Sequence, residues 1–139
     1  MGSYLGLRPR NREEAETAIQ EIERREIIGI NPGIRSLLGA VLTLGLRTAG
    51  CCEGHLEGDS FIHPYPWVSF HSHHCGNNFG ILYRVLDSYN RDHQIRWIFR
   101  DSELELRPMH EALDKGMLKD LQRSANSLAD YIFENPSGF

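Results

Sequence analysis

The chain has few lysines, few cysteines and no long apolar run. Of its 15 basic residues only Lys115 and Lys119 are lysines, and the net charge is −4 with a pI near 5.9. This balance argues against binding of polyanions by overall charge, although it is compatible with a local basic patch. No apolar run approaches the length of a transmembrane helix, and the N-terminal residues lack the apolar core of a secretory signal. We therefore expect a cytoplasmic protein with no membrane partner.

The length and composition are those of one globular domain spanning residues 1–139. Hydrophobic residues make up 40% of the chain and charged residues 24%, values that are unlike those of a disordered protein. The cysteine count is three, an odd number. Without a secretory signal, this count indicates free or metal-bound thiols in a reducing compartment.

Four helices are predicted from capping residues and from apolar residues at helical spacing. The first begins at Asn11, and the second begins at Asn31-Pro32 and ends before Gly45. The third begins at Asn77-Asn78, and the last is amphipathic and ends before residue 135. The residues expected to face the core are Ala15, Ile19 and Ile22; Ile34, Leu37, Leu38, Val41 and Leu42; Phe79, Leu82, Tyr83, Leu86 and Tyr89; and Met117, Leu118, Leu121, Leu128 and Ile132.

Four strands are predicted between these helices. Residues 46–52 and 67–71 form the first two, joined by a long loop over residues 53–66. Residues 95–100 and 103–107 alternate around an Asp101-Ser102 turn and indicate a hairpin. The element order α-α-β-β-α-β-β-α is typical of an α+β domain, a small, mostly antiparallel sheet with helices packed on it.

The strongest chemical signal is a segment rich in cysteine and histidine. All three cysteines and five of the seven histidines lie between residues 51 and 75. Thiolate and imidazole groups bind zinc-like metals, and they also serve as nucleophiles and proton carriers. These residues are Cys51, Cys52, His55, His63, His71, His73, His74 and Cys75.

A zinc-type site is the first interpretation of this segment. Side chains alternate along a strand, so Cys51 and Cys52 should lie on opposite faces, with Leu46, Thr48, Gly50 and Cys52 together on one of them. Gly54 would let the chain bend so that Cys52 and His55 converge. The end of the second strand would supply the other half of the site. The predicted metal ligands are Cys52, His55, His74 and Cys75.

Two other interpretations need no metal. In the first, Cys51 is a small core residue and His71 and His73 are exposed residues at a strand end. In the second, Cys52 is a catalytic nucleophile, His55 or His74 is its base, and Glu53 or Asp59 orients that base. The sequence alone leaves these alternatives open, together with that of a homodimeric interaction module formed through the apolar second or last helix.

Short motifs between residues 34 and 74 resemble two groups of proteins. Gly45-Leu46-Arg47-Thr48, Cys52-Glu53-Gly54-His55 and Trp67-Val68-Ser69-Phe70 resemble elements of small bacterial and phage proteins of unassigned function, which carry a Cys-x-Gly-His turn. Ile34-Arg35-Ser36-Leu37, Thr48, Cys52, Gly54, Trp67 and His74 are similar to positions in the wybutosine-synthesising tRNA methyltransferase family, of the third-enzyme kind.

The methyltransferase resemblance implies nucleic-acid modification with S-adenosylmethionine as the cofactor. It covers less than a third of the chain. Cys51, Glu53 and His55 stand where that family has serine, serine and arginine. The resemblance therefore implies a shared strand-turn-strand core more than a shared reaction.

Overall fold

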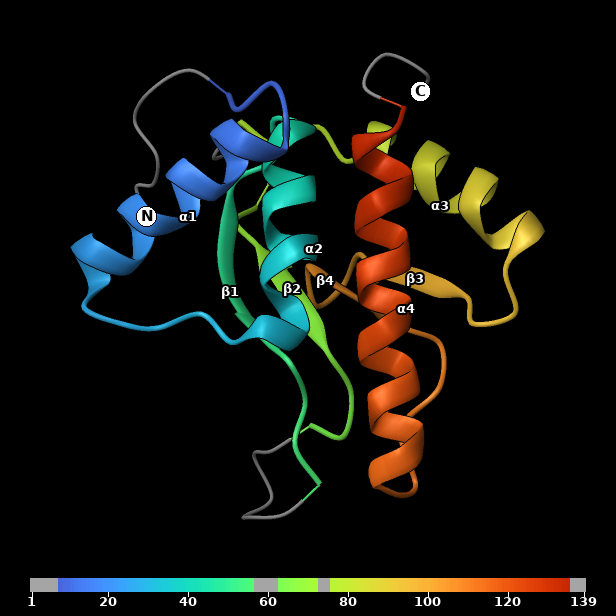
Figure 1. Cartoon of the computed structure of the whole chain (residues 1–139). Helices are drawn as coiled ribbons and strands as arrows, with labels where there is room; N and C mark the ends of the chain where they lie inside the picture. Colours follow the sequence, from blue (N-terminus) through green and yellow to red (C-terminus); the bar gives the residue numbers. More distant parts are fainter. Residues whose placement is uncertain (1–7, 57–62, 73–75, 136–139) are drawn as a thin grey trace.

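A computed structural model describes residues 8–56, 63–72 and 76–135. The described residues form four helices and a four-stranded antiparallel sheet in the order α-α-β-β-α-β-β-α, which confirms the predicted α+β fold (Figure 1). The elements are α1 (Arg12–Glu26), α2 (Pro32–Thr43), β1 (Thr48–Cys52), β2 (Trp67–Phe70), α3 (Gly80–Asp92), β3 (Trp97–Arg100), β4 (Glu105–Pro108) and α4 (Lys115–Phe133).

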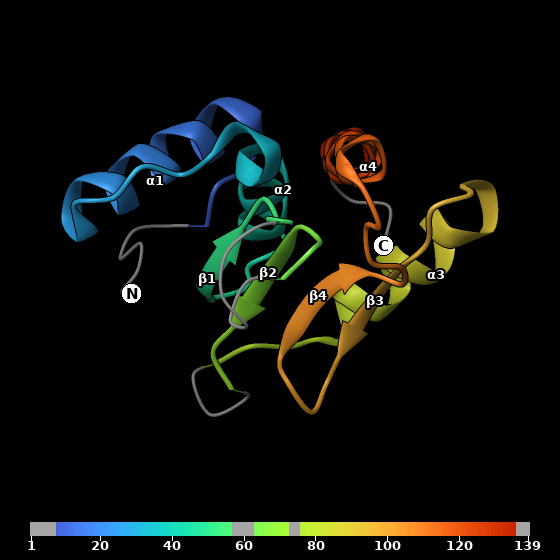
Figure 2. The same ribbon diagram turned by 90° about the horizontal axis from the view of Figure 1, so that it is seen from below.

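The sheet has the strand order β1-β2-β4-β3, so β1 and β3 form its edges. The helices α1, α2 and α4 lie on one side of this sheet, and α3 lies beside β3 (Figure 2). The predicted hairpin of β3 and β4 is confirmed, with Arg100 paired to Glu105 across a longer turn that places Leu104 at φ +52°. Because β2 runs antiparallel to β1, the start of β2 lies beside the end of β1, and the end of β2 lies beside the start of β1.

The core lies between the helices and one face of the sheet. Val68 and Leu106 are fully buried on neighbouring strands, and Trp97 and Phe99 extend the same face. The apolar faces of α2 and α4 pack on each other and on the sheet. The apolar faces of α2 and α4 are therefore covered within one chain. The homodimer remains a prediction, and the fold does not support it.

The predicted first helix start is confirmed, whereas the start of the third differs from its prediction. The Asn11 side chain accepts a hydrogen bond from Glu14 N at 2.9 Å and caps α1. The N-cap of α3 is Phe79, without a side-chain bond, because Asn77 is engaged elsewhere and Asn78 Oδ1 accepts from Gly80 N. The inward-facing position predicted for Tyr83 is also wrong.

The buried stripe of α3 explains the error at Tyr83. Leu82, Val85, Leu86 and Tyr89 follow an i, i+3, i+4, i+7 pattern and are buried. Tyr83 lies one position off this stripe and is 48% exposed, with its ring edge against Phe99. Among the described helices, none is long and apolar enough to cross a membrane.

Candidate functional site

A β-bulge in β1 sets the direction of the two adjacent cysteines. Thr48 pairs with Phe70 and Cys51 pairs with Val68, with a register shift between Thr48 and Gly50. Directly paired residues point to the same face, and both partners are buried in the core. Cys51 therefore faces the core together with Thr48. The predicted grouping of Thr48 with Cys52 on one face is wrong, because the extra residue at the bulge reverses the alternation.

Cys51 is a partly buried residue at the edge of the core. It packs against the main apolar cluster and lines a cavity of about 210 Å³ together with Ile22, Ile30 and Ile34. Burial, together with the neighbouring Cys52 and Glu26, raises the pKa of the Cys51 thiol to about 12. A thiol in this environment stays protonated near neutral pH and is a poor nucleophile and metal ligand.

Cys52 lies on the opposite face of the sheet, at the end of β1, where the chain turns. Gly54 adopts φ +96°, and its N–H donates to Cys52 Sγ at 3.4 Å. A Cβ at Gly54 would lie 2.8 Å from the Tyr65 carbonyl carbon and from Leu118 Cδ1, so the turn requires glycine. The turn presents the partly exposed Cys52 thiol and the exposed His55 imidazole.

Glu53 anchors this turn to two helices. Its Oε1 accepts from Gly33 N at 3.1 Å, at the start of α2, and its carbonyl accepts from Gln122 Nε2 on α4 at 3.0 Å. These contacts turn the carboxylate toward α2. Among the described residues, the Glu53 carboxylate accepts no hydrogen bond from His55. Glu53 therefore anchors the turn and does not orient the imidazole in this geometry.

His63 lies beside His55 across the loop. The His55 N–H donates to the His63 carbonyl at 2.9 Å, and His63 Nδ1 lies 3.3 Å from the Tyr65 hydroxyl. The Arg107 guanidinium lies 3.7 Å from the centre of the Tyr65 ring, and Tyr65 also approaches Glu105. Burial, with the Glu105 charge, raises the pKa of the Tyr65 hydroxyl. Tyr65 therefore acts as a neutral support for the His63 ring.

The end of β2 lies at the opposite end of β1 from this turn. His71 N donates to the Arg47 carbonyl, and the buried Asn77 side chain binds both backbone groups of Arg47 and the His71 carbonyl. Cys52 instead pairs with Trp67, where β2 begins. We expected the end of the second strand to lie beside the Cys52 turn. The register of β1 and β2 instead places the start of β2 there. His73, His74 and Cys75 lie outside the described residues, so their role as ligands stays a prediction.

Asp59, a candidate for orienting a base, also lies outside the described residues. In the described part of the chain, no three His, Cys, Asp or Glu side chains are placed to hold a metal ion. Cys52 and His55 thus form at most half of a coordination site in this conformation.

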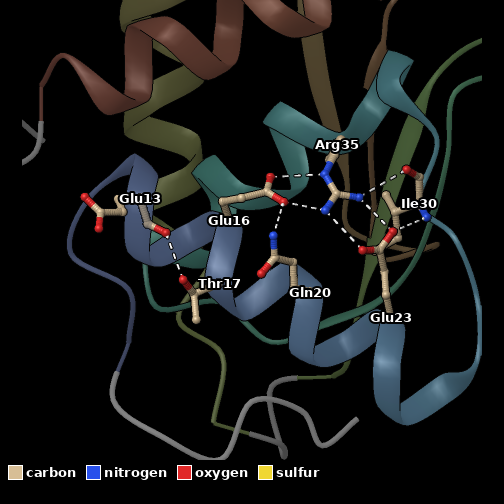
Figure 3. Close-up of polar contacts among 7 residues, drawn as sticks. All are labelled: Glu13, Glu16, Thr17, Gln20, Glu23, Ile30 and Arg35. Carbon is tan, nitrogen blue, oxygen red and sulfur yellow. Dashed lines mark hydrogen bonds and ion pairs between the residues drawn. The ribbon is translucent and has the colours of Figure 1, made fainter.

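Arg35, part of the motif that carries the methyltransferase resemblance, joins α1 to α2. Its guanidinium binds Glu16 and Glu23, and it also approaches the Ile30 carbonyl (Figure 3). Hydrogen bonds from Arg35 lower the pKa of both glutamates. This contact gives Arg35 a structural role that is independent of any reaction.

A cavity next to the turn is lined by His55 and by three polar residues of α4 that the site prediction missed. It has a volume of about 470 Å³ and lies between the turn and the start of α4. Its lining includes His55, Lys115, Lys119 and Gln122. The signal was visible in the sequence, because these are the only two lysines of the chain and their spacing of four residues places them on one helix face.

Comparison with protein-family models, with curated proteins and with solved structures gives no match to this chain.

Proposed function

We propose that the protein binds a transition metal ion of the zinc class, with Cys52 and His55 as its first two ligands. The observation that supports this proposal is the constrained turn, in which the Gly54 N–H donates to Cys52 Sγ and His55 follows three residues later. The N–H donor fixes the direction in which the Cys52 sulfur points. Hydrogen bonds to ligand atoms also orient them.

His63 is the candidate third ligand. It is held beside His55 by a backbone hydrogen bond, and its ring is positioned through Nδ1 by Tyr65. This contact leaves Nε2 to face a metal. His55 is exposed, so turning its ring toward the ion costs about 0.5–1 kcal/mol of side-chain entropy. His74 and Cys75 are the alternative ligands to complete the site.

Titration with Co²⁺ as a zinc substitute tests the proposal. We expect about one ion per chain and an absorption band from charge transfer between sulfur and cobalt. Cys52→Ser should abolish the band, and His55→Ala should weaken binding at least about tenfold. Cys51→Ser is the matched control, because Cys51 faces the core and its thiol stays protonated.

The result that would overturn the proposal is the absence of stoichiometric metal, or an equal loss of the band in the Cys51 and Cys52 variants. His63→Ala, His74→Ala and Cys75→Ser then identify the remaining ligands by which of them weakens binding. S-adenosylmethionine-dependent modification of RNA rests on the sequence resemblance alone. Calorimetric titration with that cofactor tests it separately.

A further inference from the structure

The cavity between the Cys52 turn and the start of α4 carries an inference that does not depend on the metal. Lys115, Lys119 and Gln122 line it from successive turns of one face of α4, and His55 lines it from the turn. Neither lysine forms an ion pair with any residue in the described part of the chain. Two lysines thus line a cavity of about 470 Å³ without an ion pair to Glu53, the acidic residue that also lines it.

The two lysines occupy positions that disfavour the helix itself. Lys115 is the first residue of α4, where the positive end of the helix dipole repels a cation. Lys119 follows four residues later, and like charges at this spacing repel each other. By contrast, the first turn of α1 contains Glu13 and Glu14. Local rules of helix stability therefore do not account for the placement of the lysines, whereas binding of an anion does.

Each of the two nearby carboxylates has one oxygen engaged elsewhere. Glu53 also lines the cavity, but its Oε1 accepts from Gly33 N at the start of α2. Asp114 caps α4 by accepting from Met117 N at 2.8 Å. Among the other side chains that line the cavity, the two lysines and His55 can donate hydrogen bonds to an anion with several acceptor oxygens.

We propose that this cavity binds the phosphate group of a phosphate monoester, with Lys115 and Lys119 as its principal cationic contacts and His55 as an additional donor. A phosphate dianion offers two charges for two ammonium groups and enough oxygens for all three donors. The cavity also leaves room for part of the organic group that carries the phosphate.

Titration of the full chain with inorganic phosphate, followed by amide chemical shifts in the presence of a chelator, tests this proposal apart from metal binding. We expect saturable shifts confined to the turn around His55 and to the start of α4. The double variant Lys115→Gln/Lys119→Gln should weaken binding at least about tenfold. Because it removes the repulsions described above, it should melt at the same or a higher temperature.

The matched control is Arg84→Gln/Arg96→Gln, which changes the net charge equally at exposed positions outside the cavity. It should change phosphate affinity less than about twofold. A nucleoside 5′-monophosphate distinguishes the sources: tighter binding than inorganic phosphate indicates a phosphorylated metabolite, and equal binding indicates free phosphate. Absence of saturable shifts, equal binding of sulfate and chloride, or equal weakening by the two double variants would overturn the proposal.

Discussion

Cys51 and Cys52 are neighbours in the chain, yet Cys51 faces the core and Cys52 faces the opposite side of β1. The cross-strand partner of Cys51 is the fully buried Val68, and that of Cys52 is Trp67. Cys51 packs on the apolar core, whereas Cys52 Sγ accepts the Gly54 N–H where the chain turns. Two thiols that look equivalent in the sequence therefore have different chemistry.

The first prediction concerns the reactivity of these thiols. At pH 8, iodoacetamide should modify Cys52 in the native protein much faster than it modifies Cys51. The reason is that Cys51 faces the core side of the sheet and that its pKa is raised to about 12, so little of its thiol is ionised at pH 8. Mass spectrometry of the single variants Cys51→Ser and Cys52→Ser, each in a Cys75→Ser background, measures this. Rapid labelling of Cys51 in the folded protein would contradict the assignment of its face.

The second prediction is a loss of stability at alkaline pH caused by the same thiol. The pKa of Cys51 is about 12 in the folded protein and about 8.5 in the unfolded chain, so only the unfolded chain releases the proton between these values. The stabilising contribution is complete below about pH 8.5 and falls as the pH rises toward 12. Chemical denaturation of wild type and Cys51→Ala from pH 8 to 10.5 should show a steeper decline for wild type.

The third prediction tests the constraint at Gly54. Gly54→Ala should destabilise the fold by more than about 2 kcal/mol, because it combines a left-handed backbone with a close approach to the Tyr65 backbone. Gly76→Ala is the control, since Gly76 has φ +87° but has open space around its Cβ position. That variant should lose only about 1–2 kcal/mol. Equal losses in urea denaturation would show that the approach to Tyr65 is unimportant.

The fourth prediction concerns the contact of Arg35 with α1. Arg35→Ala should lower the free energy of unfolding at pH 7 by about 1–3 kcal/mol, because it removes charged hydrogen bonds to Glu16 and Glu23. The control Arg24→Ala removes an exposed ion pair with Glu21 and should change stability by less than about 1 kcal/mol.

The effect of Arg35→Ala should also depend on pH. Arg35 lowers the folded-state pKa of both glutamates, so its contribution is present above their unfolded value near 4.3 and is lost as the pH falls through the lower folded values. The difference between wild type and variant should therefore shrink below about pH 4.5. A difference that stays constant down to pH 2.5 would show that side-chain packing, and not charge, accounts for the effect.

The fifth prediction concerns a buried polar contact in the core. Trp97 Nε1 donates to Ser124 Oγ at 2.9 Å, and Ser124 is only 7% exposed. Ser124→Ala should destabilise the protein by about 1–3 kcal/mol, because it leaves the indole N–H without an acceptor. The control is Ser127→Ala, which removes the hydrogen-bond partner of Tyr89 at a less buried position of the same helix. Both variants replace serine by alanine in α4, so they change the helix propensity equally. Thermal unfolding should show the larger loss for Ser124.

The sequence predicted the elements well because helices and strands leave local signals. Asn11 caps the first helix as expected, and the spacing of Leu121, Leu128 and Ile132 identified the buried face of α4. The prediction failed at Tyr83, which lies next to the buried stripe of α3. The helical spacing alone does not show whether an aromatic at this position is buried, because that depends on its packing against Phe99.

By itself, the sequence determined the α+β order and the concentration of thiols and imidazoles in one segment, because composition and periodicity are local properties. Only the tertiary structure decided which of these groups face the core and which of them lie close together. The bulge turned Cys51 to the core, and the antiparallel return of β2 placed His71 at the far end of β1 from Cys52. The packing of α4 beside the turn brought Lys115 and Lys119 to His55. Register and helix docking depend on contacts between distant residues, which a local pattern does not record.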